Sequence, residues 1–205
     1  MEFNIVPKFV DEALSPPAQS VGNSLANIWD LTIGNHFIYW KHKQEIKQQQ
    51  NIKEYKERIE EKTQSIPPEN LKEPDLNIVG PALEASKYYI ESDELRDMFA
   101  NLIASSIDNR KSTKSHPSFV EVIKQLTPLD AKNLSFFNKS NSLPICEYKL
   151  ASDNIKSGYQ TIYTNVFLEN PNVENIDIIS SSIENLSRLS LINNRYDAYL
   201  TNTDV

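Results

Sequence analysis

The clearest hydrophobic pattern of the chain lies between Ser92 and Asp108. Its apolar residues follow the i, i+3, i+4, i+7 and i+8 spacing of one helix face: Leu95, Met98, Phe99, Leu102 and Ile103. Ser92 is a favourable N-cap, and Asp93 and Glu94 follow it at the positive end of the helix dipole. The pattern predicts an amphipathic helix that begins after Ser92.

The chain before this helix predicts a partner helix and a long polar helix. The partner spans roughly residues 75–91, and Pro81 should kink it because proline cannot donate to the preceding turn. From His36 to Ser65 the chain has no Gly or Pro and is rich in Lys, Glu and Gln, which favour a helix. Only a narrow apolar stripe runs along it: Ile52, Tyr55, Ile59 and Ile66. A helix this polar is not expected in a core, so we predict a projecting arm or one strand of a coiled coil.

Beyond residue 126 the pattern becomes mixed. Thr127 is a predicted cap, with Pro128 in the first helical position and Asp130 three residues after the cap. The stretches LPICEYKL and YQTIYTNVFL alternate and contain β-branched and aromatic residues, which predicts strands. An amphipathic helix follows, and YDAYLT predicts a closing strand. This order resembles a winged-helix module, with Ser190 where most such modules end the helix with glycine.

These patterns predict a mainly α-helical fold in three segments. Residues 1–73 hold the N-terminal helices and the long polar arm, and residues 74–126 form a central helical core. Residues 127–205 form a small winged-helix-like α/β module.

Composition narrows the possible function classes. The formal charge of −7 argues against a dedicated nucleic-acid binder, because phosphate neutralisation needs clustered Lys and Arg. The four glycines do not form a phosphate-binding loop. The single cysteine, Cys146, excludes an internal disulfide and fits a reducing cytoplasm. The N-terminus lacks a secretory pattern, and polar residues interrupt the longest apolar stretch, so we expect a cytoplasmic chain that spans no membrane.

Three stretches together carry a family resemblance: NIVGPALEASKYYIESDELRDMFANLIASSID, HPSFVEVIKQLTPLDAKNL and ENLSRLSLI. Through them the chain resembles the bacterial abortive infection protein alpha family, most densely from about residue 74 to residue 134. The resemblance implies a role in limiting phage, or carriage on a phage or mobile element. It supplies no established active site, so no functional residue is carried over. It also implies a chain that continues past Val205.

Acidic residues crowd the predicted helix pair. Asp93 and Asp97 lie one turn apart, and Glu84 and Glu91 share a predicted face. A four-helix di-metal site needs Glu-x-x-His repeats, and no histidine stands at that spacing. Two basic residues are interleaved with the acids: Lys87 and Arg96. We therefore expect charge-paired, solvated faces rather than a metal or acid/base site.

Arg110 and His116 provide a catalytic alternative. They bracket the stretch RKSTKSH, and one helical class of RNases uses an Arg followed by a His after a short polar gap. His116 would act as general base on a ribose hydroxyl, and Arg110 would stabilise the charge of the phosphorane. The other interpretation is that His116 caps the helix that Pro117 begins.

The remaining histidines and the cysteine suggest no site. His36 and His42 are six residues apart, so they point to different helix faces and are not expected to share a metal. Cys146 lies in a predicted strand and is expected to be a buried structural thiol.

Aromatic residues before the stretch KHK allow a membrane alternative: Trp29, Phe37, Tyr39 and Trp40. Aromatic side chains beside lysines suit a helix that lies on a membrane surface. The other interpretation is that this segment is core or a subunit interface.

The charge of the C-terminal module argues against DNA. From Thr127 onward, six Lys and Arg stand against nine Asp and Glu. The candidate recognition helix carries Asp177 and Glu184 against the single Arg188, which does not suit a groove lined by phosphates. Protein contact is the better interpretation of this module.

The sequence thus predicts a non-enzymatic phage-defence protein that works through protein contacts, self-associating through its helices. No cofactor or metal is expected, and no small-molecule substrate is identified. The RNase hypothesis on Arg110 and His116 and the membrane hypothesis on residues 29–40 stay open as alternatives.

Overall fold

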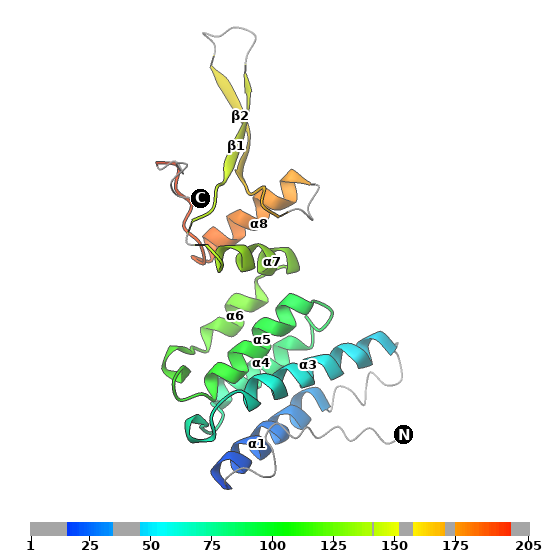
Figure 1. The fold of residues 1–205 in the computed structure, drawn as a ribbon. Coiled ribbons are helices and arrows are strands. Elements are labelled where there is room, and N and C mark those ends of the chain that lie inside the picture. The colour runs from blue at the N-terminus through cyan, green and yellow to red at the C-terminus, as the bar shows by residue number, and fades with distance from the viewer. Residues whose placement is uncertain (1–15, 35–45, 141, 152–157, 171–174, 198–205) are drawn as a thin grey trace. The chain divides into compact units, whose positions relative to one another are not determined.

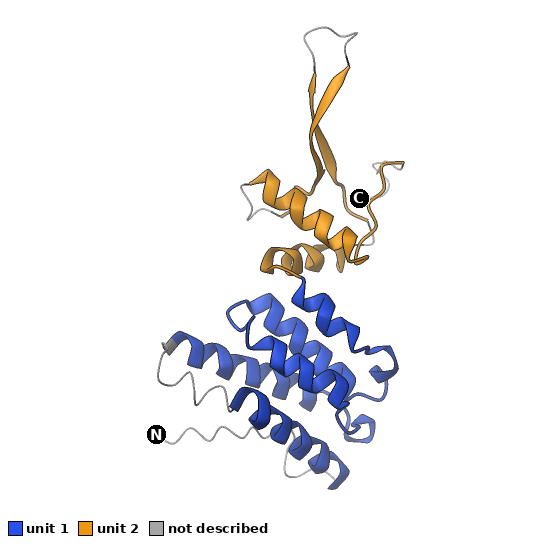
Figure 2. Cartoon of the chain, turned by 180° about the vertical axis from the view of Figure 1, so that it is seen from behind, with its two compact units in different colours: residues 1–125 blue, residues 126–205 orange. Residues whose placement is uncertain are grey.

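The computed structural model describes residues 16–34, 46–140, 142–151, 158–170 and 175–197. The chain divides into two compact units, residues 1–125 and residues 126–205 (Figure 2). Within the described ranges, seven α-helices and one two-stranded sheet confirm the predicted mainly α fold (Figure 1). The predicted boundary after residue 126 lies next to the division between the units, and the one after residue 73 falls inside the first unit.

The first unit contains the predicted helix pair, α4 (Leu76–Ser86) and α5 (Asp93–Ser106), which pack together. The Asp75 side chain caps α4 by accepting the N–H of Asn77 at 3.0 Å. Ser92 caps α5 as predicted, since its Oγ accepts the N–H of Leu95 at 3.3 Å. The caps therefore define where both helices begin.

The first helix of this pair is shorter than predicted. The chain leaves α4 after Ser86 in a tight turn, in which Tyr88 N–H donates to the carbonyl of Ala85 at 3.0 Å. Glu91 lies in the turn that follows, beyond the end of the helix. Glu84 and Glu91 consequently do not share a helix face, contrary to the expectation from their spacing.

The described part of the long polar helix is α3 (Ile46–Gln64), which packs along α5. The predicted apolar stripe is mostly buried within the unit: Tyr55, Ile59 and Ile66. Tyr55 packs against Trp29 at the end of α1 (Pro16–Trp29), with 5.7 Å between the ring centroids. A projecting arm is therefore wrong for the described residues, because even a narrow stripe is enough to attach a polar helix to its neighbours. Residues 36–45 of the predicted helix lie outside the described ranges.

The last helix of the first unit is α6 (Ser118–Lys124), which packs against α4 and α5. Val120 and Ile123 are buried, while Phe119 is exposed. The hydroxyl of Tyr89 donates to the backbone carbonyl of Lys124 at 2.7 Å and so connects the end of α6 to the turn after α4.

The second unit consists of α7 (Pro128–Phe137), strands β1 (Cys146–Ala151) and β2 (Tyr159–Val166), and α8 (Ile176–Arg188). The predicted cap of α7 is confirmed as a reciprocal capping box. Asp130 N–H donates to Thr127 Oγ1 at 3.1 Å, and Thr127 N–H donates to Asp130 Oδ2 at 2.8 Å.

A small aromatic core holds the second unit together. Phe167 is fully buried and its ring centroid lies 5.0 Å from that of Phe137 and 5.9 Å from that of Phe136. The buried face of α8 completes this core with Ile179, Ile183 and Leu186.

The end of α8 confirms the interpretation of Ser190. This residue has φ of 57°, in the left-handed region that glycine adopts most easily. Leu191 N–H donates to the carbonyl of Leu186 at 3.0 Å, and Ser190 N–H donates to that of Ser187 at 2.9 Å, which is the Schellman arrangement. The predicted closing strand lies largely outside the described residues, so the winged-helix likeness stays a prediction.

Candidate protein-contact surface

Strands β1 and β2 form a hairpin (Figure 1). Several of its apolar side chains are exposed. Tyr148, Leu150, Tyr159 and Ile162 are 42%, 61%, 65% and 47% exposed. We call these four residues the hairpin surface. Tyr148 and Leu150 lie on one face of the hairpin, and Tyr159, which pairs with Ala151, lies on the other. Single exposed apolar side chains are ordinary, whereas several large ones on one short element are typical of a contact site.

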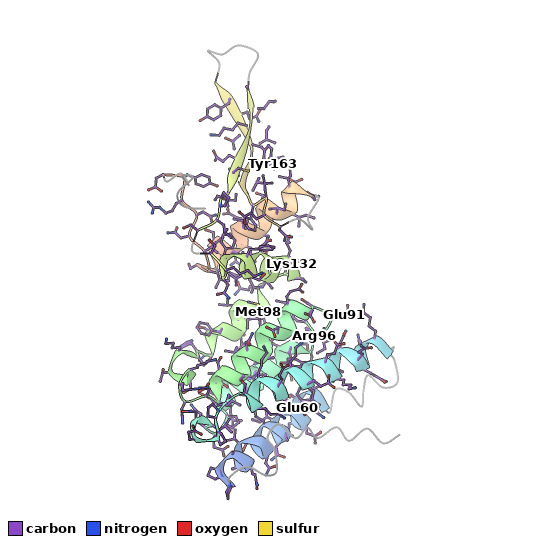
Figure 3. The ribbon with its side chains drawn as sticks, in the orientation of Figure 1. Glu60, Glu91, Arg96, Met98, Lys132 and Tyr163 are labelled. Carbon is purple, nitrogen blue, oxygen red and sulfur yellow. The ribbon has the colours of Figure 1, made fainter. Side chains whose placement is uncertain are left out.

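The pairing register of the hairpin, which contains a bulge in β2, shows which side chains share a face. Tyr148 pairs with Tyr163, but the next residue, Lys149, pairs with Thr161, so β2 has an extra residue at Ile162. A second irregularity lies between Tyr163 and Val166, which pairs with Cys146. Because side chains alternate along a strand, Tyr148 and Leu150 share one face of the hairpin and Lys149 points to the other. The rings of Tyr148 and Tyr163 meet edge to face, with centroids 6.4 Å apart and an angle of 85°; Tyr163 is labelled on β2 in Figure 3.

The described charges of the hairpin neutralise each other. Lys149 Nζ lies 2.9 Å from Glu147 Oε2 and 4.3 Å from the centroid of the Tyr159 ring. The hydrogen bond with Glu147, followed by that with Tyr159, raises the pKa of Lys149. This part of the hairpin is therefore apolar, aromatic and without net charge, which suits a protein partner better than a phosphate backbone.

Asn165 attaches the base of the hairpin to the rest of the second unit. It is 6% exposed and has φ of 55°, where asparagine is among the few tolerated side chains. Its Nδ2 donates to Glu184 of α8 at 2.6 Å, and its Oδ1 accepts from Asn194 at 3.0 Å and from the Tyr196 hydroxyl. This network fixes the direction in which the hairpin leaves the helices.

The acidic residues of the helix pair are engaged in ion pairs. Asp93 accepts hydrogen bonds from Arg58 of α3 and from Arg96, and Lys62 Nζ lies 2.8 Å from Asp97. Partial burial opposes ionisation of Asp93, but the two guanidinium groups prevail and lower its pKa. Lys87 forms an ion pair with Glu84. The charge pairing agrees with the expectation, but the expected solvation does not hold for the two basic residues, because Lys87 and Arg96 are buried.

No metal site emerges from these acids. Within the described residues, no three His, Cys, Asp or Glu side chains gather as a metal ion would need. Glu91 is exposed in its turn (Figure 3).

Arg110 and His116 each have a local partner. Arg110 forms a bidentate pair with Asp108, with Nη2 2.7 Å and Nε 2.9 Å from its carboxylate oxygens. This hydrogen bonding lowers the pKa of Asp108, which is almost fully buried. His116 Nδ1 accepts the N–H of Ser118 at 3.1 Å, the capping contact weighed in the sequence. The RNase hypothesis stays a prediction.

The membrane hypothesis loses one of its residues. Trp29 is 1% exposed and packed on Tyr55, so it is not available to a surface. The other members of the segment and both N-terminal histidines lie outside the described residues: His36, Phe37, Tyr39, Trp40 and His42. Among the helices that are described, none has the length and apolarity needed to cross a membrane.

Cys146 opens β1 and is half-buried, with Sγ 3.5 Å from the carbonyl oxygen of Val166 on β2. Burial raises the pKa of its thiol. A thiol with a raised pKa is a poor nucleophile. The thiol was expected to be buried and is only half-buried, and its structural role stays a prediction.

The sequence model of the abortive infection alpha family matches residues 47–205. The chain belongs to the abortive infection alpha family. No curated protein and no solved structure matches it. The family match begins within α3 and includes the whole second unit, so the hairpin surface lies inside the part of the chain that establishes membership.

In this member of the abortive infection alpha family, sequence reasoning found the strands but missed the surface they form. The alternation of β1, with Tyr148 and Leu150 on one face and Glu147 and Lys149 on the other, is typical of a strand with one buried face, so it did not indicate that Tyr148 and Leu150 would be exposed. Only the fold shows that no third described strand covers them.

Proposed function

We propose that this abortive infection alpha protein limits phage infection in the bacterial cytoplasm by binding a protein partner through the hairpin surface, without catalysing a reaction. Family membership supports the defence role. The contact role is supported by one observation above all, the four large apolar side chains exposed together on one hairpin.

Charge supports a protein partner over a nucleic acid. Lys149 is the only described cation of the two strands, and it forms an ion pair with Glu147. A surface that tracks phosphates needs several unpaired cations in a row. Exposed tyrosines beside aliphatic side chains are instead the composition of protein interfaces.

The long polar helix is a weaker candidate for this contact than its sequence indicates. The apolar stripe of α3 is largely buried within its own unit, with Tyr55 and Ile59 both at 1% exposure or less. The described residues therefore leave α3 little apolar surface for a second helix. We accordingly assign the contact to the hairpin.

A phage challenge tests the proposal. Cells carrying the wild type are compared with cells carrying Leu150→Ser with Tyr159→Ser, by plaque number and host survival. Both side chains are exposed, so the double variant should fold and yet lose protection. The matched control is Leu76→Ser with Tyr88→Ser in the first unit, where the side chains are 66% and 76% exposed. Full protection by a folded hairpin variant would contradict the contact role.

A further inference from the structure

Strand β1 carries a charge order that is complementary to itself. Glu147, Tyr148 and Lys149 follow one another, and all three belong to the strand. If two β1 strands pair antiparallel about a two-fold axis at Tyr148, residue 147 of each copy lies opposite residue 149 of the other. Each acid then faces a base twice in the same interface, as a symmetric contact requires.

We propose that the hairpin binds a second copy of this chain edge to edge through β1, in a four-stranded antiparallel sheet that brings Tyr148 and Leu150 of the hairpin surface to the interface. The proposal rests on the function proposed above and names its partner. The two-fold axis at Tyr148 also pairs Cys146 with Leu150, so it uses nearly the whole length of β1.

The edge of β1 is more open than the edge of β2. Near the base of the hairpin, Asn165 N–H of β2 donates to the Tyr196 hydroxyl at 3.1 Å. The carbonyl of Thr164 accepts the Ser180 hydroxyl of α8 at 2.6 Å. Among the described residues, no hydrogen bond from outside the hairpin reaches the backbone of β1. As far as the described residues go, a new strand can therefore add to β1 without displacing an existing hydrogen bond.

The same pairing extends the aromatic contact that the hairpin already has. Residues that lie opposite each other in an antiparallel pair share a face of the sheet. The edge-to-face contact of Tyr148 with Tyr163 would become a row of four tyrosines, two from each copy. Leu150 lies on this face, and the paired charges of Glu147 and Lys149 lie on the other.

The isolated hairpin has physical reasons to recruit strands. A two-stranded sheet is marginally stable in water, and its unpaired edges are templates for further pairing. Lysine on an edge strand commonly prevents such pairing, but here Glu147 lies 2.9 Å from Lys149 and neutralises it. The edge is thus left without electrostatic protection against a copy of itself.

Charge reversal in the full chain tests the register. Glu147→Lys alone places lysine against lysine across the axis, and Lys149→Glu alone places glutamate against glutamate. Sedimentation velocity should show a dimer for the wild type and dissociation constants raised about tenfold or more for each variant. An equimolar mixture of the two variants should restore the dimer, because both cross-axis pairs become opposite in charge again.

The mixture also tests whether the variants dissociate only because each has lost its ion pair within the chain. Both variants lack the pair between residues 147 and 149 within each chain, so only a contact between chains can rescue association. A second measurement places the axis: in a Cys146→Ser background, Tyr148→Cys should form an intermolecular disulfide on oxidation, and Gln160→Cys on β2 should not. The proposal is overturned if the wild type is still monomeric at a protein concentration of about 100 micromolar, or if the mixture of the two variants fails to associate.

The phage challenge on the same variants separates two questions: whether the partner is a second copy, and whether the hairpin contact protects cells. If the wild type is monomeric and the hairpin variants lose protection, the partner is not a second copy, and the proposed contact is with another protein. A dimer that the charge variants disrupt without loss of protection supports the interface and contradicts its role in defence.

Discussion

Arg96 Nη2 on α5 lies 3.2 Å from Glu54 Oε2 on α3. The arginine is 4% exposed, and its guanidinium also donates to Asp93 at 3.0 Å and to the carbonyl of Asn51 at 3.3 Å. Figure 3 places it on α5 beside α3. Among the described residues its Nε has no partner, so the pairing of this buried cation is incomplete. Arg96 therefore contributes to the contact between α3 and α5 both by packing and by its charge.

Replacing Arg96 separates these two roles. Arg96→Ala should lower the free energy of unfolding by about 2 kcal/mol, because it removes the buried stem and takes one donor from each of three acceptors. Arg96→Met keeps the stem and should recover about half of that loss. Urea denaturation followed by circular dichroism measures both. Lys53→Ala is the control, since its pair with Glu57 is exposed and should contribute little. Equal losses for Ala and Met would show that the stem contributes nothing.

The lowered pKa of Asp93 predicts a pH dependence of stability. A carboxyl whose pKa is lower in the folded state stabilises the fold above its unfolded pKa, and this contribution disappears as pH falls through the folded pKa. The wild type should thus lose stability below about pH 4, and Asp93→Asn should lose less over that interval. Urea midpoints measured from pH 7 to pH 2.5 check this. Glu57→Gln, which changes an exposed pair, should leave the wild-type slope unchanged.

Ser190 offers a stabilising substitution. Its φ of 57° strains an L-residue, so Ser190→Gly should stabilise the second unit by about 0.5 kcal/mol after the greater freedom of glycine in the unfolded chain is subtracted. Ser187→Gly, in the last turn of α8, should destabilise it by about 0.5–1 kcal/mol. Denaturant midpoints for the two variants should therefore move in opposite directions. A lower midpoint for Ser190→Gly would contradict the strain.

Local signals predicted most of the helical fold. Ser92, Thr127 and Ser190 each specify a helix end by their own chemistry, and all three ends lie where the sequence places them. The end of α4 was misplaced because its turn depends on the backbone rather than on a cap residue. The sequence predicted that Asp93 and Asp97 would form ion pairs. It did not predict Arg58 and Lys62 as partners, because they belong to another helix and spacing along one helix cannot show them.

Two features were beyond reach of the sequence because they depend on tertiary contacts. The polarity of α3 suggested an arm, yet burial of Tyr55 and Ile59 is decided by what α1 and α5 present to them. Whether the side chains of the hairpin surface are exposed depends on which elements pack over the faces of the hairpin, which alternation within a strand does not reveal. Asn165, the residue that attaches the hairpin, resembles any polar strand residue until its partners Glu184 and Tyr196 are placed.

Substitutions of His116 distinguish the proposed protein-contact function from the RNase alternative. His116→Asn keeps an acceptor for the N–H of Ser118 and so preserves the helix cap, but it removes the imidazole that an RNase would need as general base. We expect this variant to protect cells from phage as well as the wild type does, because the hairpin surface is untouched. His116→Ala, which also loses the cap, should lower the free energy of unfolding by about 1 kcal/mol and still protect. Plaque counts and the integrity of cellular RNA during infection measure the two outcomes. Loss of protection together with intact RNA in cells carrying His116→Asn would refute the contact mechanism and establish Arg110 and His116 as the place to look for a nuclease.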